Sequence, residues 1–308
     1  MVTMKYRFFA PRRIVGVITS ATVLTLQLWV SPTLAKDPFR ATNQHQIGDK
    51  TEAAFKALFK DGNYTATEAY LQQAESSEPN EPLAYAMKAS LAYAKKDLDS
   101  LNSYGQKTLD TAQQLMTTDP LRGNLYGAVG HFLQGAAILT RDGTLKGTPQ
   151  ALSELQQVYQ YLDKAEAISS TDPELNLIRG FMDLVIAVNL PFSNPEQAME
   201  RLEKFAGPNY LAERGLAIGY RDLDEYTEAL GAVDRAMQAT GDNPELFYLK
   251  AQILAKQSKN QKNPALLQDA LVNFDKAITK KDQLPAPLVK QIERERTKAA
   301  KRLSNPGQ

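Results

Sequence analysis

The chain has 308 residues, of which 43% are hydrophobic and 23% are charged, and its formal net charge at neutral pH is +1. This length suffices for a continuous buried core, and a charge near zero argues against a nucleic-acid-binding protein. The sequence contains no cysteine, which excludes disulfide bonds, thiol catalysis and cysteine-ligated metals.

The first 35 residues have the layout of a secretory signal peptide. Four basic residues and no acidic one precede an uncharged, mostly apolar run at 14–30. Thr33 and Ala35 occupy the −3 and −1 positions of a cleavage site, so Lys36 would begin the mature chain. We therefore expect an exported protein, which is periplasmic, lumenal or extracellular after cleavage. The alternative is an uncleaved membrane anchor, for which the apolar run is slightly short.

After a loop expected at 36–48, one spacing recurs through residues 49–284. It consists of an apolar residue, two spacers, an alanine, seven further residues and a proline. The five copies are Leu71–Ala74–Pro82, Leu109–Ala112–Pro120, Leu162–Ala165–Pro173, Val233–Ala236–Pro244 and Phe274–Ala277–Pro285. A proline is well tolerated at the first position of a helix, where its missing N–H would have no partner. Each copy therefore predicts the end of one helix and the start of the next.

A second spacing is tied to the first. A glycine or alanine lies seven residues after most of these prolines: Ala89, Gly127, Gly180 and Ala251, with Gly215 after Pro208. Seven residues are two helical turns, so each small side chain lies on the same face as its proline. This pattern predicts helices that approach each other closely.

The segments "DEYTEALGAVDRAMQATGDNPE" (224–245) and "DGNYTATEAYLQQAESSEPN" (61–80) resemble the second helix and exit of the tetratricopeptide repeat (TPR), a 34-residue helix–turn–helix unit. The resemblance implies an all-α, TPR-like solenoid of about six helix pairs, with a closing helix at 285–303 and a tail at 304–308. Most intervals between the prolines exceed 34 residues, which predicts insertion loops at 141–149 and 256–263. The alternative is an unrelated helical solenoid or bundle. The design also resembles exported TPR proteins of Gram-negative-type bacteria, cyanobacteria included.

The resemblance also implies a binding groove, because TPR arrays line their inner face with the first helix of each unit. The matching positions here are Tyr93, Asn124, His131, Phe132, Phe181, Leu184, Asn209, Tyr220, Tyr248, Gln252 and Lys256. Such a groove would be aromatic and rich in amides, with little charge. It suits an extended peptide or an apolar ligand.

Residues that could perform chemistry are sparse. The two histidines, His45 and His131, do not have metal-ligand spacing, and no Gly-x-Ser-x-Gly elbow or glycine-rich phosphate loop occurs. Four glycines at 123, 127, 130 and 135 predict close helix packing. We expect no enzymatic activity, no cofactor and no metal. The enzymatic alternative would depend on His131 or a buried carboxylate.

The sequence thus predicts an exported scaffold that binds a protein or peptide partner in its groove, such as an assembly factor. The alternative is a carrier of a small apolar ligand or lipid in the same groove. Without the four basic residues of the signal segment the formal charge changes from +1 to −3, yet residues 276–308 contain nine basic and three acidic side chains. A weak contact with an anionic surface through this basic closing helix remains an open alternative, and no nucleic-acid partner is expected.

Overall fold

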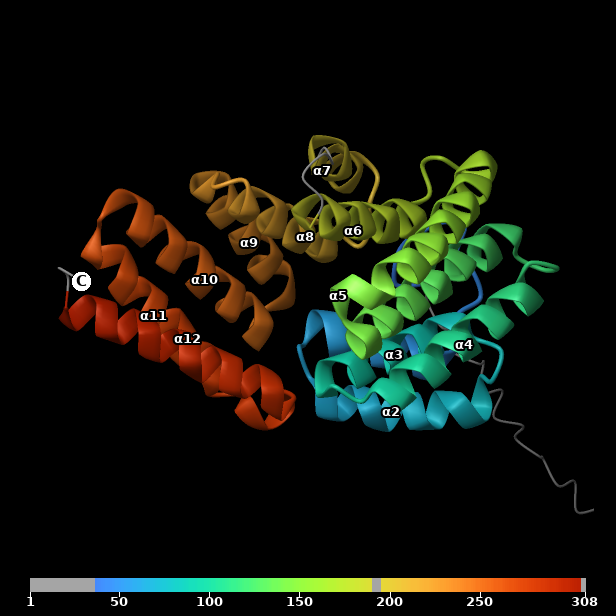
Figure 1. Cartoon of the computed structure of the whole chain (residues 1–308), viewed down its shortest axis with the longest axis horizontal. Coiled ribbons are helices and arrows are strands. Elements are labelled where there is room, and N and C mark those ends of the chain that lie inside the picture. Colours follow the sequence, from blue (N-terminus) through green and yellow to red (C-terminus); the bar gives the residue numbers. More distant parts are fainter. Residues whose placement is uncertain (1–36, 190–194, 306–308) are drawn as a thin grey trace, which may run out of the picture. The chain divides into compact units, whose positions relative to one another are not determined.

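Helices make up nearly all of the described structure (Figure 1). The computed structural model describes residues 37–189 and 195–305, which belong to one compact unit, Ala35–Gln308. These residues form twelve α-helices, packed in adjacent pairs, and contain no β-strand. The expected all-α architecture is confirmed at this level. The signal segment expected at 1–35 lies outside the described residues.

The first half of the unit holds five α-helices and one π-helical turn. They are α1 (Asp49–Phe55), η1 (Lys56–Lys60), α2 (Tyr64–Ser77), α3 (Pro82–Lys95), α4 (Leu98–Leu115) and α5 (Pro120–Ile168). Here α1 packs against α2, and α3 against α4, while α4 also packs along the first half of α5.

The second half holds seven α-helices and a 3-10 turn. They are α6 (Pro173–Asn189), α7 (Pro195–Lys204), α8 (Asn209–Asp222), α9 (Tyr226–Thr240), α10 (Pro244–Gln261), α11 (Pro264–Ile278), η2 (Lys281–Gln283) and α12 (Ala286–Ser304). The pairs are α6 with α7, α8 with α9 and α10 with α11, and α12 packs against α11.

Most of the predicted prolines mark helix starts, whereas Pro208 and Pro285 lie one position before α8 and α12, so the closing helix runs over Ala286–Ser304. Pro82, Pro120, Pro173 and Pro244 each occupy the first position of a helix. The side chain just before each of the four caps the new helix: Glu81 accepts from Leu83 N–H, Asp119 from Arg122 N–H, Asp172 from Leu175 N–H and Asn243 from Glu245 N–H. Such caps satisfy N–H groups that the first helical turn leaves without partners.

The prediction of a loop at 141–149 is wrong. These residues are helical, and α5 reverses at a single residue, Gly143, whose φ of 74° and ψ of 170° are non-helical. Only glycine adopts this backbone region readily, so one residue can separate the two halves of α5 without an intervening loop. The halves then pack against each other, since a Cβ on Gly127 would lie 2.9 Å from the ring of Tyr161.

The prediction of a loop at 256–263 is also wrong. Helix α10 continues to Gln261, and Gln257 and Ser258 are buried in it. The helix ends where Lys262 takes a left-handed conformation, and Asn263 immediately caps α11 by accepting from Ala265 N–H. The linker between α10 and α11 is short because polar residues near the end of α10, Gln257 and Ser258, pack in the interior and keep this segment helical.

Close helix packing at the glycines is confirmed for three of the four predicted. Added Cβ atoms on Gly123, Gly127 and Gly130 would approach atoms of Met116, Tyr161 and Leu109 to 2.5–2.9 Å. At Gly135 the space is ordinary, with the nearest atom at 3.5 Å. The alanines of the repeat behave in the same way: Ala74, Ala112, Ala165, Ala236 and Ala277 are fully buried.

Early and late segments of the chain contact each other directly. The side chain of Asn243, at the start of α10, donates to the carbonyl oxygens of Phe59 and Lys60 in η1, at 3.2 and 3.1 Å. Thr65 of α2 donates to the carbonyl of Asp282 at 3.2 Å. Hydrogen bonds therefore join η1 to the start of α10 and α2 to η2. Within 37–189 and 195–305, no helix combines the length and the apolar run that a membrane crossing requires.

Candidate ligand-binding site

An apolar cavity of about 340 Å³ lies among the first helices of five successive units. Its lining comes from the N-terminal segment, α1, η1, α3, α5, α6 and α8, and is apolar except for Ser90, Arg214 and the Tyr126 hydroxyl. The lining residues are Phe39, Phe55, Phe59, Leu83, Ala86, Met87, Ser90, Tyr126, Val129, Leu177, Ile178, Phe181, Met182, Leu211, Arg214 and Ile218. This volume lies within the range of small-molecule sites in proteins.

The sequence places these side chains by helical periodicity. In α3, Leu83, Ala86, Met87 and Ser90 recur at intervals of three and four residues, which lie on one face of a helix. The inner end of this face is buried, whereas Ser90 is exposed. The cavity is therefore closed at the start of α3 and reaches solvent near Ser90.

Aromatic rings form one wall of the cavity. The centroid of Phe55 lies 4.8 Å from that of Phe39, edge to face, and 4.8 Å from that of Phe59. Phe59 belongs to the π-helical turn η1, in which Asp61 N–H bonds to the carbonyl of Lys56 at 3.1 Å. Such turns occur often at functional sites.

The polar end of the cavity is formed by Arg214. Its Nη2 donates to Oε2 of Glu245 at 2.6 Å, and the two side chains are 21% and 12% exposed. A smaller pocket of about 90 Å³ adjoins this pair and shares Phe59, Ser90 and Arg214 with the large cavity. Burial is the largest influence on the pKa of Arg214 and lowers it, but the charge of Glu245, the nearby Tyr64 and the hydrogen bond to Glu245 together raise the pKa, so the guanidinium stays charged.

Tyr64 completes this polar end. It lines the small pocket with Glu245. Burial raises the pKa of the Tyr64 hydroxyl, and the charge of Glu245 raises it further. The hydroxyl is therefore neutral at physiological pH, with the Glu245 carboxylate as its hydrogen-bond partner.

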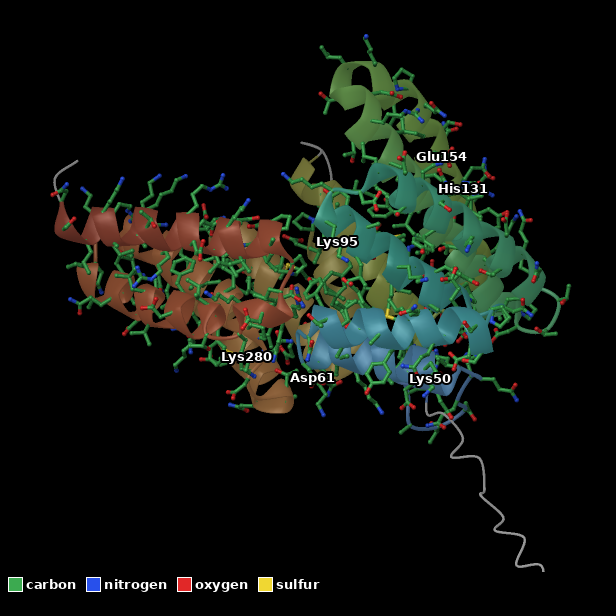
Figure 2. All side chains as sticks on the ribbon, turned by 90° about the horizontal axis from the view of Figure 1, so that it is seen from below. Lys50, Asp61, Lys95, His131, Glu154 and Lys280 are labelled. Atoms are coloured by element: carbon green, nitrogen blue, oxygen red, sulfur yellow. The ribbon has the colours of Figure 1, made fainter. Side chains whose placement is uncertain are left out.

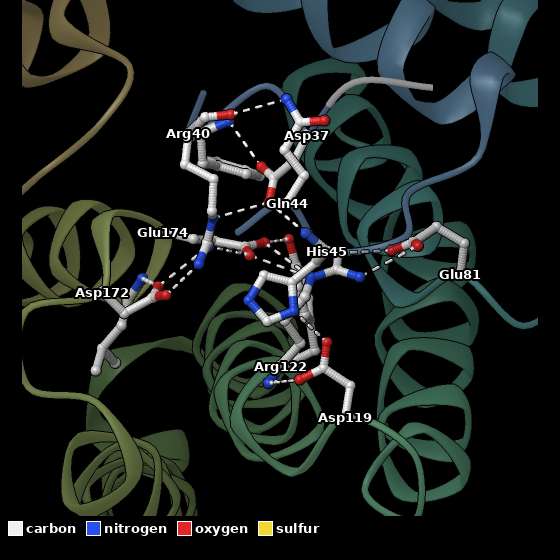
Figure 3. Close-up of polar contacts among 12 residues, drawn as sticks. Asp37, Arg40, Gln44, His45, Glu81, Asp119, Arg122, Asp172 and Glu174 are labelled. Atoms are coloured by element: carbon white, nitrogen blue, oxygen red, sulfur yellow. Dashed lines mark hydrogen bonds and ion pairs between the residues drawn. The ribbon is translucent and has the colours of Figure 1, made fainter. Parts of the chain in front are cut away.

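A buried ionic network lies beside the cavity, next to Tyr126 (Figure 3). Arg122, only 1% exposed, donates to Glu81 at 2.9 Å and to Glu174 at 3.1 Å. Tyr126 lines the cavity with its ring and donates its hydroxyl to Glu174 at 2.6 Å. Burial raises the pKa of Glu174, and Arg122 opposes the rise.

The same network fastens the N-terminal segment. Arg40 forms ion pairs with Asp37, Asp172 and Glu174, and His45 pairs with Asp119. Phe39, which lies within this fastened segment, is 5% exposed and closes the cavity wall. The carboxylates come from the starts of α3, α5 and α6, where the helix dipole favours negative charge. The network therefore has a structural role at the closed end of the cavity.

The predicted groove residues do not converge on one surface. Of the residues named for it, Phe181 lines the apolar cavity. Tyr93, Asn209 and Lys256 are exposed, Asn124 donates to the carbonyl of Pro120 in its own helix, and Tyr220 and Leu184 belong to the core or pack against it.

His131 is not part of the cavity lining and lies beside Glu154 in the second half of α5 (Figure 2). Its Nδ1 lies 2.8 Å from Glu154 and its ring stacks on Tyr161 at 5.4 Å. Phe132 packs in the same cluster of α5 and α6. Both side chains therefore serve helix packing.

Gln252 and Lys256 do lie together, in a second cleft between α8, α10 and α12 with a volume of about 400 Å³. Gln252 accepts from Arg221 at 3.0 Å and donates to Glu295 at 3.0 Å. Tyr248 lies next to this cleft and packs against Phe274. Five basic and two acidic side chains line the cleft: Arg221, Lys256, Lys259, Lys298, Arg302, Asp222 and Glu295.

Sequence reasoning missed Arg214 and the aromatic wall. One signal was present, since Arg214 interrupts an apolar stripe formed by Leu211 and Ile218 on α8. Among the described residues, no group of three His, Asp or Glu side chains is placed to hold a metal ion.

Comparison with family models, with curated proteins and with solved structures gives no match to this chain.

Proposed function

We propose that this chain is a non-catalytic binding protein, a TPR-like array whose inner helices enclose a small apolar ligand. The 340 Å³ cavity carries this proposal, because thirteen of its sixteen lining residues are apolar and lack a hydroxyl or charge. Paired helices that start at regularly placed prolines support the TPR-like description. A concave apolar pocket of this volume, open to solvent near Ser90, suits a compact ligand.

The size of the cavity indicates the size of the ligand. At roughly 30 Å³ for each water-sized group, the volume accommodates about eleven such groups. A ten-carbon chain is a suitable probe. At about −0.5 kcal/mol per non-hydrogen atom, decanol would bind with a Kd of roughly 0.1 mM.

Titration calorimetry with decanol tests the proposal. Ser90→Phe places a bulky side chain at the exposed rim of the cavity and should weaken decanol binding at least about tenfold. The matched control is Ser103→Phe, an exposed position on α4 outside the cavity lining. No saturable decanol binding by the wild-type protein, or equal binding by both variants, would contradict a cavity ligand.

A protein partner is the second candidate, and the basic cleft between α8, α10 and α12 favours it. An acidic peptide would complement its excess of positive charge. Lys256→Gln/Lys259→Gln should weaken binding of a fluorescent octa-glutamate peptide, measured by anisotropy. The control, Lys290→Gln/Lys301→Gln, removes equal charge from another face of α12. An equal loss in the control would indicate non-specific attraction and favour an anionic surface instead.

Export completes the proposal. It is supported by the basic start, apolar run and Thr33–Ala35 cleavage site of residues 1–35. Cleavage there would leave Lys36 next to Asp37, which is 3% exposed and bound to Arg40. A mature protein would therefore begin at the network that closes the cavity.

A further inference from the structure

Arg214 is the one charged side chain that lines the apolar cavity, among the residues that the structure describes. It projects from α8 between Leu211 and Ile218, which also line the cavity. A charge in such a wall costs desolvation, and a buried ion pair is often no more stabilising than an apolar replacement. Packing alone therefore does not account for an arginine at this position.

Most N–H donors of the Arg214 guanidinium have no hydrogen-bond partner among the described residues. Arginine carries five N–H donors, and within the described ranges the Arg214 side chain makes one hydrogen bond, to Glu245. The planar group binds a carboxylate through two parallel hydrogen bonds when the partner is free to approach. Since the Arg214 side chain is 21% exposed, a ligand group can reach it.

The small pocket beside Arg214 limits the size of that group. Its volume of about 90 Å³ corresponds to roughly three water-sized groups. Leu58, Phe59 and Leu91 form its apolar walls, and Tyr64, Ser90, Arg214 and Glu245 its polar ones. Three heavy atoms are the size of a carboxylate, whereas a phosphate monoester head group is larger.

We propose that the ligand is a single-chain amphiphile with a carboxylate head, whose chain fills the apolar cavity and whose carboxylate binds Arg214 in the adjoining pocket. This inference rests on the proposed function and specifies its ligand class. Without a ligand, Glu245 neutralises the guanidinium. The ligand carboxylate binds the N–H donors of Arg214 that Glu245 leaves free, and the two carboxylates compete for the charge of the guanidinium.

A matched series of ten-carbon probes tests the head group: decanoate, decanol, decylamine and decyl phosphate. Wild-type protein should bind decanoate at least about tenfold more tightly than decanol, because a hydrogen bond to a charged group is stronger than one to a neutral group. Arg214→Gln should abolish this preference, because it weakens decanoate binding much more than decanol binding. Arg235→Gln, which removes an exposed arginine on α9, is the control and should change neither affinity.

Glu245→Gln distinguishes ligand binding from a structural role of the ion pair. It removes the competing carboxylate and should strengthen decanoate binding several-fold, opposite to Arg214→Gln. Weaker decanoate binding in both variants would mean that the pair only supports the fold, and would overturn the inference.

The remaining outcomes are also decisive. Decanol binding as tight as that of decanoate overturns the head-group assignment but leaves the cavity ligand standing. Tighter binding of decyl phosphate or decylamine overturns the carboxylate assignment. If no probe of the series binds, the proposed function itself fails.

Discussion

Replacing Arg122 by methionine tests the buried network at the closed end of the cavity. The guanidinium contacts Glu81 at 2.9 and 3.3 Å and Glu174 at 3.1 and 3.4 Å, and the arginine is 1% exposed. Arg122→Met removes the cation between two buried carboxylates, and Glu174 then keeps only Arg40, at 3.4 Å, and the Tyr126 hydroxyl. Removal of one partner from such a pair costs about 3–5 kcal/mol. This is a large part of the roughly 5–15 kcal/mol that stabilises an ordinary domain.

The assay is urea unfolding followed by circular dichroism, at pH 7.5 and again at pH 5. Burial raises the pKa of Glu174 above its ordinary 4.5, and Arg122 opposes this rise, so the variant raises it further. A carboxyl with a raised pKa favours the folded state below its unfolded pKa, and that contribution is lost as pH rises through the folded pKa. The deficit of Arg122→Met should therefore be largest at pH 7.5 and smaller at pH 5.

The matched control is Arg235→Met, whose guanidinium also meets a carboxylate twice, at 2.7 and 2.9 Å, but is 55% exposed. Solvent screening limits its loss to about 1 kcal/mol or less. A loss below about 1 kcal/mol for Arg122→Met, or a deficit that grows as pH falls, would refute the electrostatic reasoning.

Three further predictions concern single positions. Gly143→Ala should lower the free energy of unfolding in urea by about 1–3 kcal/mol, because φ is 74° there. No atom lies within 4 Å of an added Cβ, so the loss would come from backbone strain alone. Gly231→Ala, in mid-helix, should instead raise the free energy of unfolding by about 0.5–1 kcal/mol, and the same sign at both positions would contradict the explanation. Burial raises the pKa of Asp222, but the hydrogen bond from Arg221 helps lower it below its ordinary 3.8. Asp222→Asn should thus lose about 0.5–1 kcal/mol above pH 4, and the loss should disappear as pH falls through the folded pKa; a loss independent of pH would count against the ion pair. Terminal sequencing of protein from the exported fraction should begin at Lys36, whereas a chain that retains residues 1–35 would indicate a membrane anchor.

The helix starts could be predicted because they are local. A proline at the first position and an acceptor side chain just before it satisfy the first turn of a helix within a few residues of sequence. Asp119 with Pro120 and Asn243 with Pro244 show this directly. The missed reversal at Gly143 is also local, but a lone glycine inside a long helical pattern has several structural meanings.

The candidate site could not be predicted in the same way. The TPR resemblance assigns equivalent positions of each first helix to one groove, which requires every helix to present the same face. In α3 the cavity begins at Leu83, directly after its proline, whereas in α5 it begins at Tyr126, well into the helix. The cavity is therefore lined by different positions of the two helices, and His131 lies beside Glu154 while Phe181 faces the cavity.

By itself the sequence determined an all-helical chain, the starts of its helices and the small residues at their contacts, because capping and periodicity act over a few turns. Tertiary structure alone decided the cavity, its closure by Phe39 and the position of Arg214 at its polar end. These features depend on how helices distant in sequence are rotated and brought together, as where Asn243 meets Phe59, and no local pattern encodes that rotation.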